Sequence, residues 1–190
     1  MKDYKKYFSD TCSAVLDEIS RALKETDPNQ VEKLIEEILK AEKVFTVGVG
    51  RVLLSLQAFT KRLAHLGIDA HYVGEITEPA ITEKDLLIVG SGSGSSVFPV
   101  EIAKKANSLE ATIVHIGSNP NGSIKEYATF MVRIPVRTKL NLADEVDSCQ
   151  PMTSLFEQSL LLLGDIIAKS IIDDKELDMK SLWQYHANLE

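Results

Sequence analysis

Apolar residues follow two different periods along the chain, and the change of period divides it into segments. From Tyr4 to Leu23, and again from Val31 to Leu39 after the break at DPNQ, they recur at helical spacing. We therefore expect two amphipathic helices first. Five short apolar runs rich in β-branched residues predict strands; in chain order they are KVFTVGVG, DAHYVGE, DLLIVGSG, ATIVHIG and ATFMVRIP.

Segments of helical period separate these strands. The period is clear in RVLLSLQAFTKRLAHLG and VFPVEIAKKANSLE and weaker in EITEPAITEK and GSIKEYA. Such alternation is typical of a parallel sheet covered by helices on both faces. We expect a single α/β domain over residues 1–190, a three-layer sandwich with a five-stranded parallel sheet. Its parts are N-terminal helices (1–42), a βαβ core (43–150) and C-terminal helices (151–190).

The C-terminal part begins with PMTSLFEQSLLLLGDIIAKSII, which predicts a long helix from about Pro151, and the segment DMKSLWQYHANLE predicts a short one. Apolar residues cover most directions of the long helix, so it must be buried on several sides. In a domain this small, a subunit interface is the natural cover, and we expect a homo-oligomer. Residues 136–148 are expected to be irregular.

Composition narrows the range of partners. The net charge is −7 and no Lys/Arg cluster offsets it, which disfavours nucleic acid and anionic membranes as partners. The two cysteines, Cys12 and Cys149, stand alone, and no His/Cys group has metal-ligand spacing, so we expect no metal site. The N-terminus lacks the apolar core of a signal peptide and no apolar run reaches membrane-spanning length, which favours a cytoplasmic protein.

The stretch GSGSGSS, residues 90–96 and below the Gly/Ser loop, follows an apolar strand and precedes a predicted helix. This is the carboxyl end of a parallel sheet, where open α/β folds bind ligands. Glycines allow close approach of the backbone, the hydroxyls donate, and a helix start favours anions. The loop therefore predicts a phosphate site with Ser91, Ser93, Ser95 and Ser96 as donors. The alternative is a solvated linker.

Two further turns follow strands. VGVGRV resembles a dinucleotide fingerprint weakly, because Leu53 stands where the third glycine belongs, although Glu75 imitates the ribose-binding acid. Gly48 and Gly50 more simply allow a ligand to approach, with Arg51 as its charge partner. The third turn contains NPNG, which predicts a structural turn.

Glu157 is the candidate general base, since it lies within the apolar helix, where burial raises a carboxyl pKa. The alternative is a carboxylate at a polar edge or in an ion pair. His65 is either its acid–base partner or a histidine placed favourably at a helix C-terminus. His186, near the chain end, is by itself expected to be exposed. His71 and His115, on predicted strands, are expected to be structural.

Five stretches together closely resemble the 6-phospho-3-hexuloisomerases, a family of sugar isomerase (SIS) domains: VGVGR with AFTKRLAHLG, HYVGE, DLLIVGSGSGSS, QPMTSLFEQSLLLL and HANLE. The resemblance implies a flavodoxin-like fold and a homotetramer with sites at subunit interfaces. It implies interconversion of 3-hexulose 6-phosphate and fructose 6-phosphate, a step of the ribulose monophosphate route, by proton transfer through an enediol. It implies that the reaction needs no cofactor and no metal.

Residue by residue, the resemblance implies a role for several positions. Phosphate contacts fall on Ser91, Ser93 and Ser96, with Gly48, Gly50 and Arg51 in the facing turn. Acid–base roles fall on Glu157 and His65, and the shared tail implies that His186 reaches the site of a neighbouring subunit.

The sequence departs from the family pattern in two turns. Where the first turn of the family reads GxGRSG, Val52 replaces the serine and Leu53 the glycine; where the Gly/Ser loop reads SGSGET, Ser95 and Ser96 stand. Losing one neutral phosphate contact costs about 1 kcal/mol, and the valine would occupy space beside the phosphate. Three alternatives to the main hypothesis follow: an isomerase for another ketose phosphate, a catalytically silent sugar-phosphate-binding protein, and a structural oligomer without a ligand.

Overall fold

The sheet organises the molecule. The structure, a computed structural model, describes residues 3–189; Met1, Lys2 and Glu190, the last residue of the HANLE motif, lie outside the described residues. Five strands pair in parallel in the order β2-β1-β3-β4-β5, which is the flavodoxin-like order. The strands are β1 (Val44–Val47), β2 (Ala70–Tyr72), β3 (Leu86–Gly90), β4 (Thr112–Gly117) and β5 (Phe130–Arg133). The five predicted strands and their parallel arrangement are confirmed.

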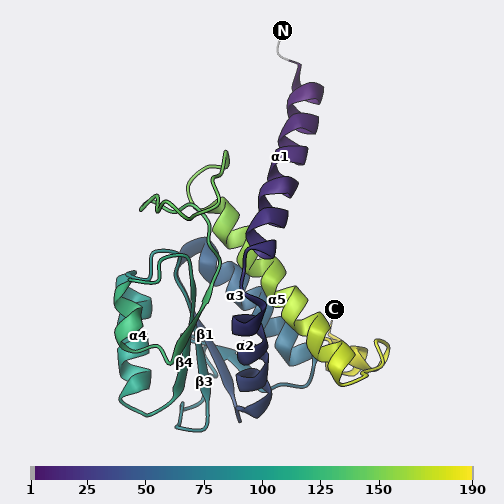
Figure 1. Cartoon of the computed structure of the whole chain (residues 1–190). Coiled ribbons are helices and arrows are strands. Elements are labelled where there is room, and N and C mark those ends of the chain that lie inside the picture. Colours follow the sequence, from purple (N-terminus) through teal and green to yellow (C-terminus); the bar gives the residue numbers. More distant parts are fainter. Residues whose placement is uncertain (1–2, 190) are drawn as a thin grey trace.

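The helices form the two outer layers (Figure 1). On one face of the sheet, α2, α3 and α5 bury a large apolar cluster with Val44, Ile88 and Val114. On the other face, α4 and a short 3-10 helix, η1, cover Phe45 and Leu87. The bounds are α1 (Tyr4–Lys24), α2 (Pro28–Lys40), α3 (Gly50–His65), α4 (Val97–Asn107), η1 (Ser123–Glu126) and α5 (Ser154–Asp174). The predicted three-layer sandwich is thus confirmed.

The two N-terminal helices begin where the sequence provides caps. The Asp3 carboxylate accepts from the Lys5 and Lys6 N–H groups, and that of Asp27 accepts from the Asn29 N–H at 2.9 Å. Figure 1 shows the first turns of α1 extending away from the rest of the molecule, while its last turns lie against α5. Several large apolar side chains on the extending part are therefore exposed, among them Tyr4, Tyr7 and Phe8.

Three helix predictions need correction. Residues 75–84 form turns, not a helix, because Pro79 has no N–H to donate and disfavours a helical residue before it. The segment GSIKEYA forms only η1, and the C-terminal segment forms only a 3-10 helix, η2 (Ser181–Tyr185). Residues 136–148 are irregular as predicted, with a single bridge from Val136 to Val146.

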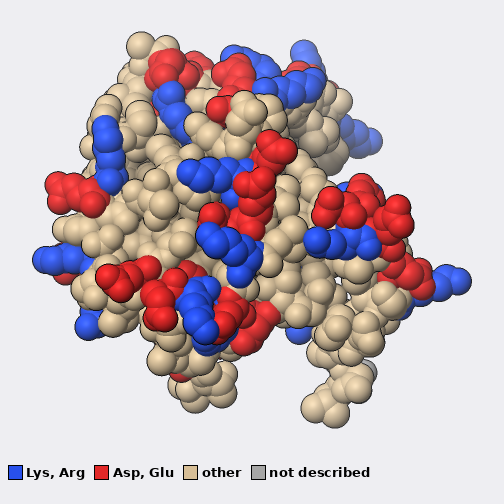
Figure 2. Space-filling view, turned by 60° about the horizontal axis from the view of Figure 1, so that its bottom comes forward, with Lys and Arg blue, Asp and Glu red and all other residues tan. Residues whose placement is uncertain are grey.

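Charges of both signs are scattered over the surface drawn in Figure 2, where Lys and Arg side chains lie beside Asp and Glu among residues of other kinds. None of the helices in residues 3–189 combines the length and the apolarity that crossing a bilayer requires.

Candidate active site

A large cavity lies at the carboxyl ends of β1 and β3, with a volume of about 1050 Å³. The strand order reverses here, since β2 is added on one side of β1 and β3 on the other. In open parallel sheets such a switch point leaves a crevice between the loops that leave the two strands. Here those loops are the start of α3, with Gly50 and Arg51, and the Gly/Ser loop.

The Gly/Ser loop folds back on itself through hydrogen bonds of Ser91. The Ser91 hydroxyl is buried, accepts from the Gly94 N–H at 3.1 Å and pairs with the Ser96 hydroxyl at 3.1 Å. Gly94 has a φ of +65°, a left-handed conformation that favours glycine. In residues 3–189, the N–H groups of Gly92, Ser93 and Ser96 have no acceptor in the protein. These donors lie beside the first turn of α4, so the loop presents a surface suited to an anion.

The NPNG turn holds the carbonyl side of this loop. The carbonyl of Gly92 accepts from the N–H groups of residues 118 and 119, and that of Gly94 accepts from the N–H of residue 124, each at 3.0 Å. The side-chain amide of Asn119 donates to the Ser93 carbonyl at 3.0 Å. Gly122 and Gly94 touch, because a Cβ atom on Gly122 would lie 2.5 Å from the Cα atom of Gly94. The predicted structural turn therefore supports the loop directly.

Glu157, in the first turn of α5, faces the cavity and is 8% exposed. Its Oε2 atom accepts from the Nε atom of Arg51, and its Oε1 atom accepts from the Thr153 hydroxyl at 2.8 Å. The Glu157 main-chain carbonyl accepts from the Ser55 hydroxyl at 2.8 Å, which joins α5 to α3. The structure thus brings Glu157 and Arg51 together in the cavity that the Gly/Ser loop also lines. The guanidinium side chain is largely exposed and keeps further N–H donors for a ligand.

Two of the predicted phosphate-binding residues lie away from the cavity. Gly48 packs under α3, where a Cβ atom would lie 3.1 Å from Leu56, so helix packing explains this glycine. Ser95 is exposed and its hydroxyl accepts from the Ser123 N–H at 3.3 Å. The remaining five, Gly50, Arg51, Ser91, Ser93 and Ser96, line the cavity.

Sequence analysis missed one wall of the cavity, which residues 137–150 supply. Thr138, Lys139, Ser148 and Gln150 line the cavity there. The carboxylate of Glu18, from α1, accepts from the Ser148 hydroxyl at 2.7 Å, from the Cys149 N–H at 2.7 Å and from the Gln150 amide at 2.9 Å. Burial alone would raise its pKa, but these bonds outweigh burial and lower the pKa of Glu18 to about 2. No sequence pattern predicts this contact between two segments that lie 130 residues apart in the chain.

His65 and His186 lie together, but elsewhere. Their rings stack with centroids 5.2 Å apart, and the ring of His186 also contacts Trp183 at 5.0 Å, beside a second cavity of about 510 Å³. Arg51 and His65 occupy opposite ends of α3, about 21 Å apart along its axis at 1.5 Å per residue. Within one chain, therefore, neither histidine reaches Glu157.

The His65 ring lies in surroundings that disfavour its charged form and leave one of its nitrogens without a hydrogen bond in the described part of the chain. Burial, and then the charges of Lys61, Arg62 and His186, lower its pKa, which favours the neutral ring. Its Nε2 atom is buried, and no hydrogen-bond partner for it occurs in the described part of the chain.

Comparisons with known proteins agree on one family. The SIS domain profile matches residues 37–162. The 3-hexulose-6-phosphate isomerase of Bacillus subtilis is 37% identical over 93% of this chain and 95% of its own length, and that of Mycobacterium gastri is 36% identical over 94% and 89%. A crystal structure from Methanococcus jannaschii, from which a 3-hexulose-6-phosphate isomerase function was inferred, superposes with a TM-score of 0.84 at 31% identity, covering 95% of this chain and 99% of that one.

Proposed function

The chain belongs to the SIS domain family, among the 3-hexulose-6-phosphate isomerases, and on this premise we propose that it interconverts 3-hexulose 6-phosphate and fructose 6-phosphate. The observation that carries the proposal is one cavity in which the Glu157–Arg51 pair faces the Gly/Ser loop. One side of that cavity suits a phosphate and the other suits proton transfer.

The phosphate of the substrate would bind at the Gly/Ser loop. Its oxygens would accept from the free N–H groups of Gly92, Ser93 and Ser96 and from the serine hydroxyls. Because the carbonyls of this loop are bonded to the NPNG turn, no reorganisation is needed to present the donors. The phosphate anchors the sugar so that its C2 and C3 atoms extend toward α5.

Proton transfer would then take place at Glu157. Its carboxylate removes the proton from C2 of 3-hexulose 6-phosphate, which leaves a 2,3-enediolate, and returns a proton to C3 to give fructose 6-phosphate. In the same conversion the C3 carbonyl oxygen gains a proton and the C2 hydroxyl loses one. The remaining N–H donors of the Arg51 guanidinium stabilise the oxygen that becomes negative. Thr153, bonded to the other carboxylate oxygen, fixes the direction of Glu157.

The protons on oxygen would be carried by His65 and His186 of a neighbouring copy in a homotetramer. This arrangement accounts for histidines far from Glu157 in their own chain and for the buried Nε2 atom of His65. It also accounts for exposed apolar side chains on α1 and α5, which a partner would cover; they include Tyr7, Phe8, Leu162 and Ile166. We place the enzyme in the cytoplasm and in the ribulose monophosphate route, because its charged substrates do not cross a bilayer unaided.

A second function has one observation in its favour. Val52 lines the cavity where the family pattern has a serine, and its Cγ1 atom packs toward Gly48 and Gly90. The missing hydroxyl and the added methyl groups alter the phosphate end of the cavity. A related ketose phosphate as substrate, or sugar-phosphate binding without turnover, is the alternative that this residue supports.

The test is turnover of 3-hexulose 6-phosphate made in place from formaldehyde and ribulose 5-phosphate, with fructose 6-phosphate followed by a coupled dehydrogenase. Glu157→Gln should lower kcat about a hundredfold or more, since general catalysis is typically worth that much. Glu101→Gln removes an exposed carboxylate on α4 and should leave kcat unchanged.

Binding separates the alternatives. A silent binding protein would be stabilised by fructose 6-phosphate but would not exchange its C3 proton with solvent. An isomerase of another ketose phosphate would turn over a different substrate, and Val52→Ser should then move its preference toward 3-hexulose 6-phosphate.

A further inference from the structure

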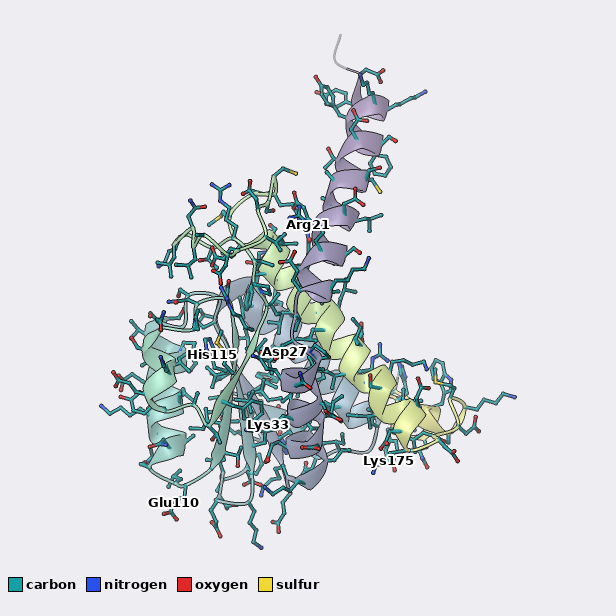
Figure 3. All side chains as sticks on the ribbon, in the orientation of Figure 1. Arg21, Asp27, Lys33, Glu110, His115 and Lys175 are labelled. Carbon is teal, nitrogen blue, oxygen red and sulfur yellow. The ribbon has the colours of Figure 1, made fainter. Side chains whose placement is uncertain are left out.

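His115 lies on β4, on the face of the sheet that α4 covers (Figure 3). The residue is 3% exposed. Its Nε2 atom lies 2.8 Å from the main-chain carbonyl oxygen of Ser91, the residue from which the Gly/Ser loop leaves β3. A carbonyl oxygen only accepts, so the ring nitrogen must donate, and Nε2 carries the proton.

The ring has no room to move. A Cβ atom on Gly117 would lie 2.2 Å from the Nε2 atom of His115, and one on Gly94 would lie 3.1 Å from its Cε1 atom. The absence of side chains at both glycines creates the space for the imidazole directly beneath the loop. Burial lowers the pKa of His115, which keeps the ring neutral with a single N–H in place.

The bond reaches Ser91, whose carbonyl and hydroxyl both fold the loop back at Gly94. The Ser91 carbonyl also accepts from the Gly94 N–H at 3.1 Å, and the Ser91 hydroxyl accepts from that same N–H. By orienting the Ser91 peptide, His115 sets the direction of the N–H of Gly92, one of the donors without an acceptor in residues 3–189. The next three carbonyls are held by the NPNG turn, and His115 supplies the side-chain contact to the first.

We propose that His115 is a positioning residue for phosphate binding, which fixes the Ser91 peptide so that the Gly/Ser loop presents its donors to the substrate phosphate. This inference rests on the proposed function in so far as it takes the loop to be the phosphate site. His115 does not touch the sugar, so it acts on the affinity for the phosphate and leaves the proton-transfer step intact.

The variants are His115→Leu, which removes the donor at similar size, and His115→Gln, whose side-chain amide restores one. Inorganic phosphate and fructose 6-phosphate affinities are measured by calorimetry, and KM and kcat by turnover. His115→Leu should weaken both affinities and raise KM about tenfold, the effect of roughly one hydrogen bond to a buried acceptor, with kcat nearly unchanged. His115→Gln should recover most of the loss. His71→Gln, a histidine on the edge strand β2, serves as the matched control and should change neither affinity.

Unchanged phosphate affinity in folded His115→Leu overturns the inference, as does a fall in kcat at constant KM, which indicates fewer folded molecules. If His115→Leu fails to fold, the exchange rate of the His115 Nε2 proton is measured in the wild-type protein. This exchange should slow when phosphate is added, and an unchanged rate overturns the inference. Failure of the proposed function gives a different result. Wild-type protein that binds phosphate without turnover refutes the isomerase and leaves the His115 affinity test valid. Wild-type protein that binds no phosphate refutes both proposals.

Discussion

The two ends of helix α3 hold two parts of the predicted site that differ in how far one chain completes them. At the N-terminal end, Arg51 pairs with Glu157, Thr153 bonds the other Glu157 carboxylate oxygen, and the Gly/Ser loop lines the same cavity. At the C-terminal end, His65 and His186 are held by ring stacking, and the His65 Nε2 atom is buried without a partner in residues 3–189. One chain therefore pairs the candidate base at the N-terminal end of α3, whereas at the C-terminal end it leaves a histidine nitrogen without a partner among the described residues.

The candidate phosphate loop and the two histidines therefore differ in whether one chain can complete them. The candidate phosphate loop and the candidate base depend on contacts within the loops after β1 and β3 and within α5, which one chain supplies. The histidines are about 21 Å away along α3 and gain a role in catalysis only if another copy brings them to the cavity. The following experiments test whether the two ends of α3 differ in this way.

The largest effect is expected at the histidine end. His65→Asn should lower kcat about a hundredfold, as loss of an acid–base group does. If His65 of one copy serves Glu157 of another, mixing His65→Asn with Glu157→Gln subunits should restore activity in about a quarter of the sites in a symmetric assembly. Turnover of the remixed oligomer is the measurement.

Subunit exchange is first verified by native mass spectrometry, and His65→Asn mixed with itself is the control. Mixed oligomers that stay inactive would place His65 outside the active site, and the two ends of α3 would then be functionally unconnected.

A smaller effect is expected at the loop end from Gly122→Ala. Its Cβ atom would lie 2.5 Å from both the Cα and the carbonyl oxygen of Gly94, so the NPNG turn and the Gly/Ser loop must separate. Overpacking of this kind costs about 2–3 kcal/mol, and the affinity for fructose 6-phosphate should fall with it. Urea denaturation and calorimetry measure both quantities.

Gly74→Ala is the matched control. Gly74 has a φ of +95° but nothing within 4 Å of an added Cβ atom, so it should show backbone strain of about 1–2 kcal/mol and no loss of affinity. Equal affinities in both variants would show that the loop does not depend on the NPNG turn.

Glu18→Gln tests how α1 holds the wall of the cavity. The folded pKa of Glu18 is about 2 against 4.5 for the free group, so its contribution to stability is fully present above pH 4.5 and is lost as the pH falls toward 2. The variant should lose about 1–2 kcal/mol at pH 7, less than the full shift implies, because the amide oxygen still accepts. Thermal unfolding at pH 7 and pH 3 should show a smaller difference from wild type at pH 3. A difference independent of pH would contradict the role of the charge.

The sheet and its loops could be predicted because their signals are local. Each strand is a short β-branched run, and GSGSGSS between a strand and a helix indicates the phosphate end before any contact is known. The Arg51–Glu157 pair could be predicted only as two candidates, because residues 106 apart in sequence meet through the packing of α5 on α3.

Other parts of the candidate site have no local sequence pattern that predicts them. The Glu18 contacts and the wall from residues 138–150 depend on where α1 packs and on an irregular segment without periodicity. Gly48 was assigned to ligand approach, whereas the close packing of Leu56 explains it. His115 was expected to be structural, and only its 2.8 Å contact with the Ser91 carbonyl connects it to the loop.

The smallest expected effect is a difference between two histidine pKa values. Burial and nearby cations lower the pKa of His65. Burial would also lower the pKa of His71, but the hydrogen bonds that its ring donates to Glu75 and Asp69 outweigh burial and raise it. Stability from neutral His65 is present above pH 6.5 and is lost as the pH falls through its folded pKa; that from charged His71 is present below pH 6.5 and is lost as the pH rises through its own. An NMR titration of the rings should therefore find His71 protonated and His65 neutral near pH 6.5. If the pKa of His65 in the assembled protein is instead higher than that of His71, an acidic group of another copy must pair with the buried His65 nitrogen. The C-terminal end of α3 would then gain its missing partner from that copy.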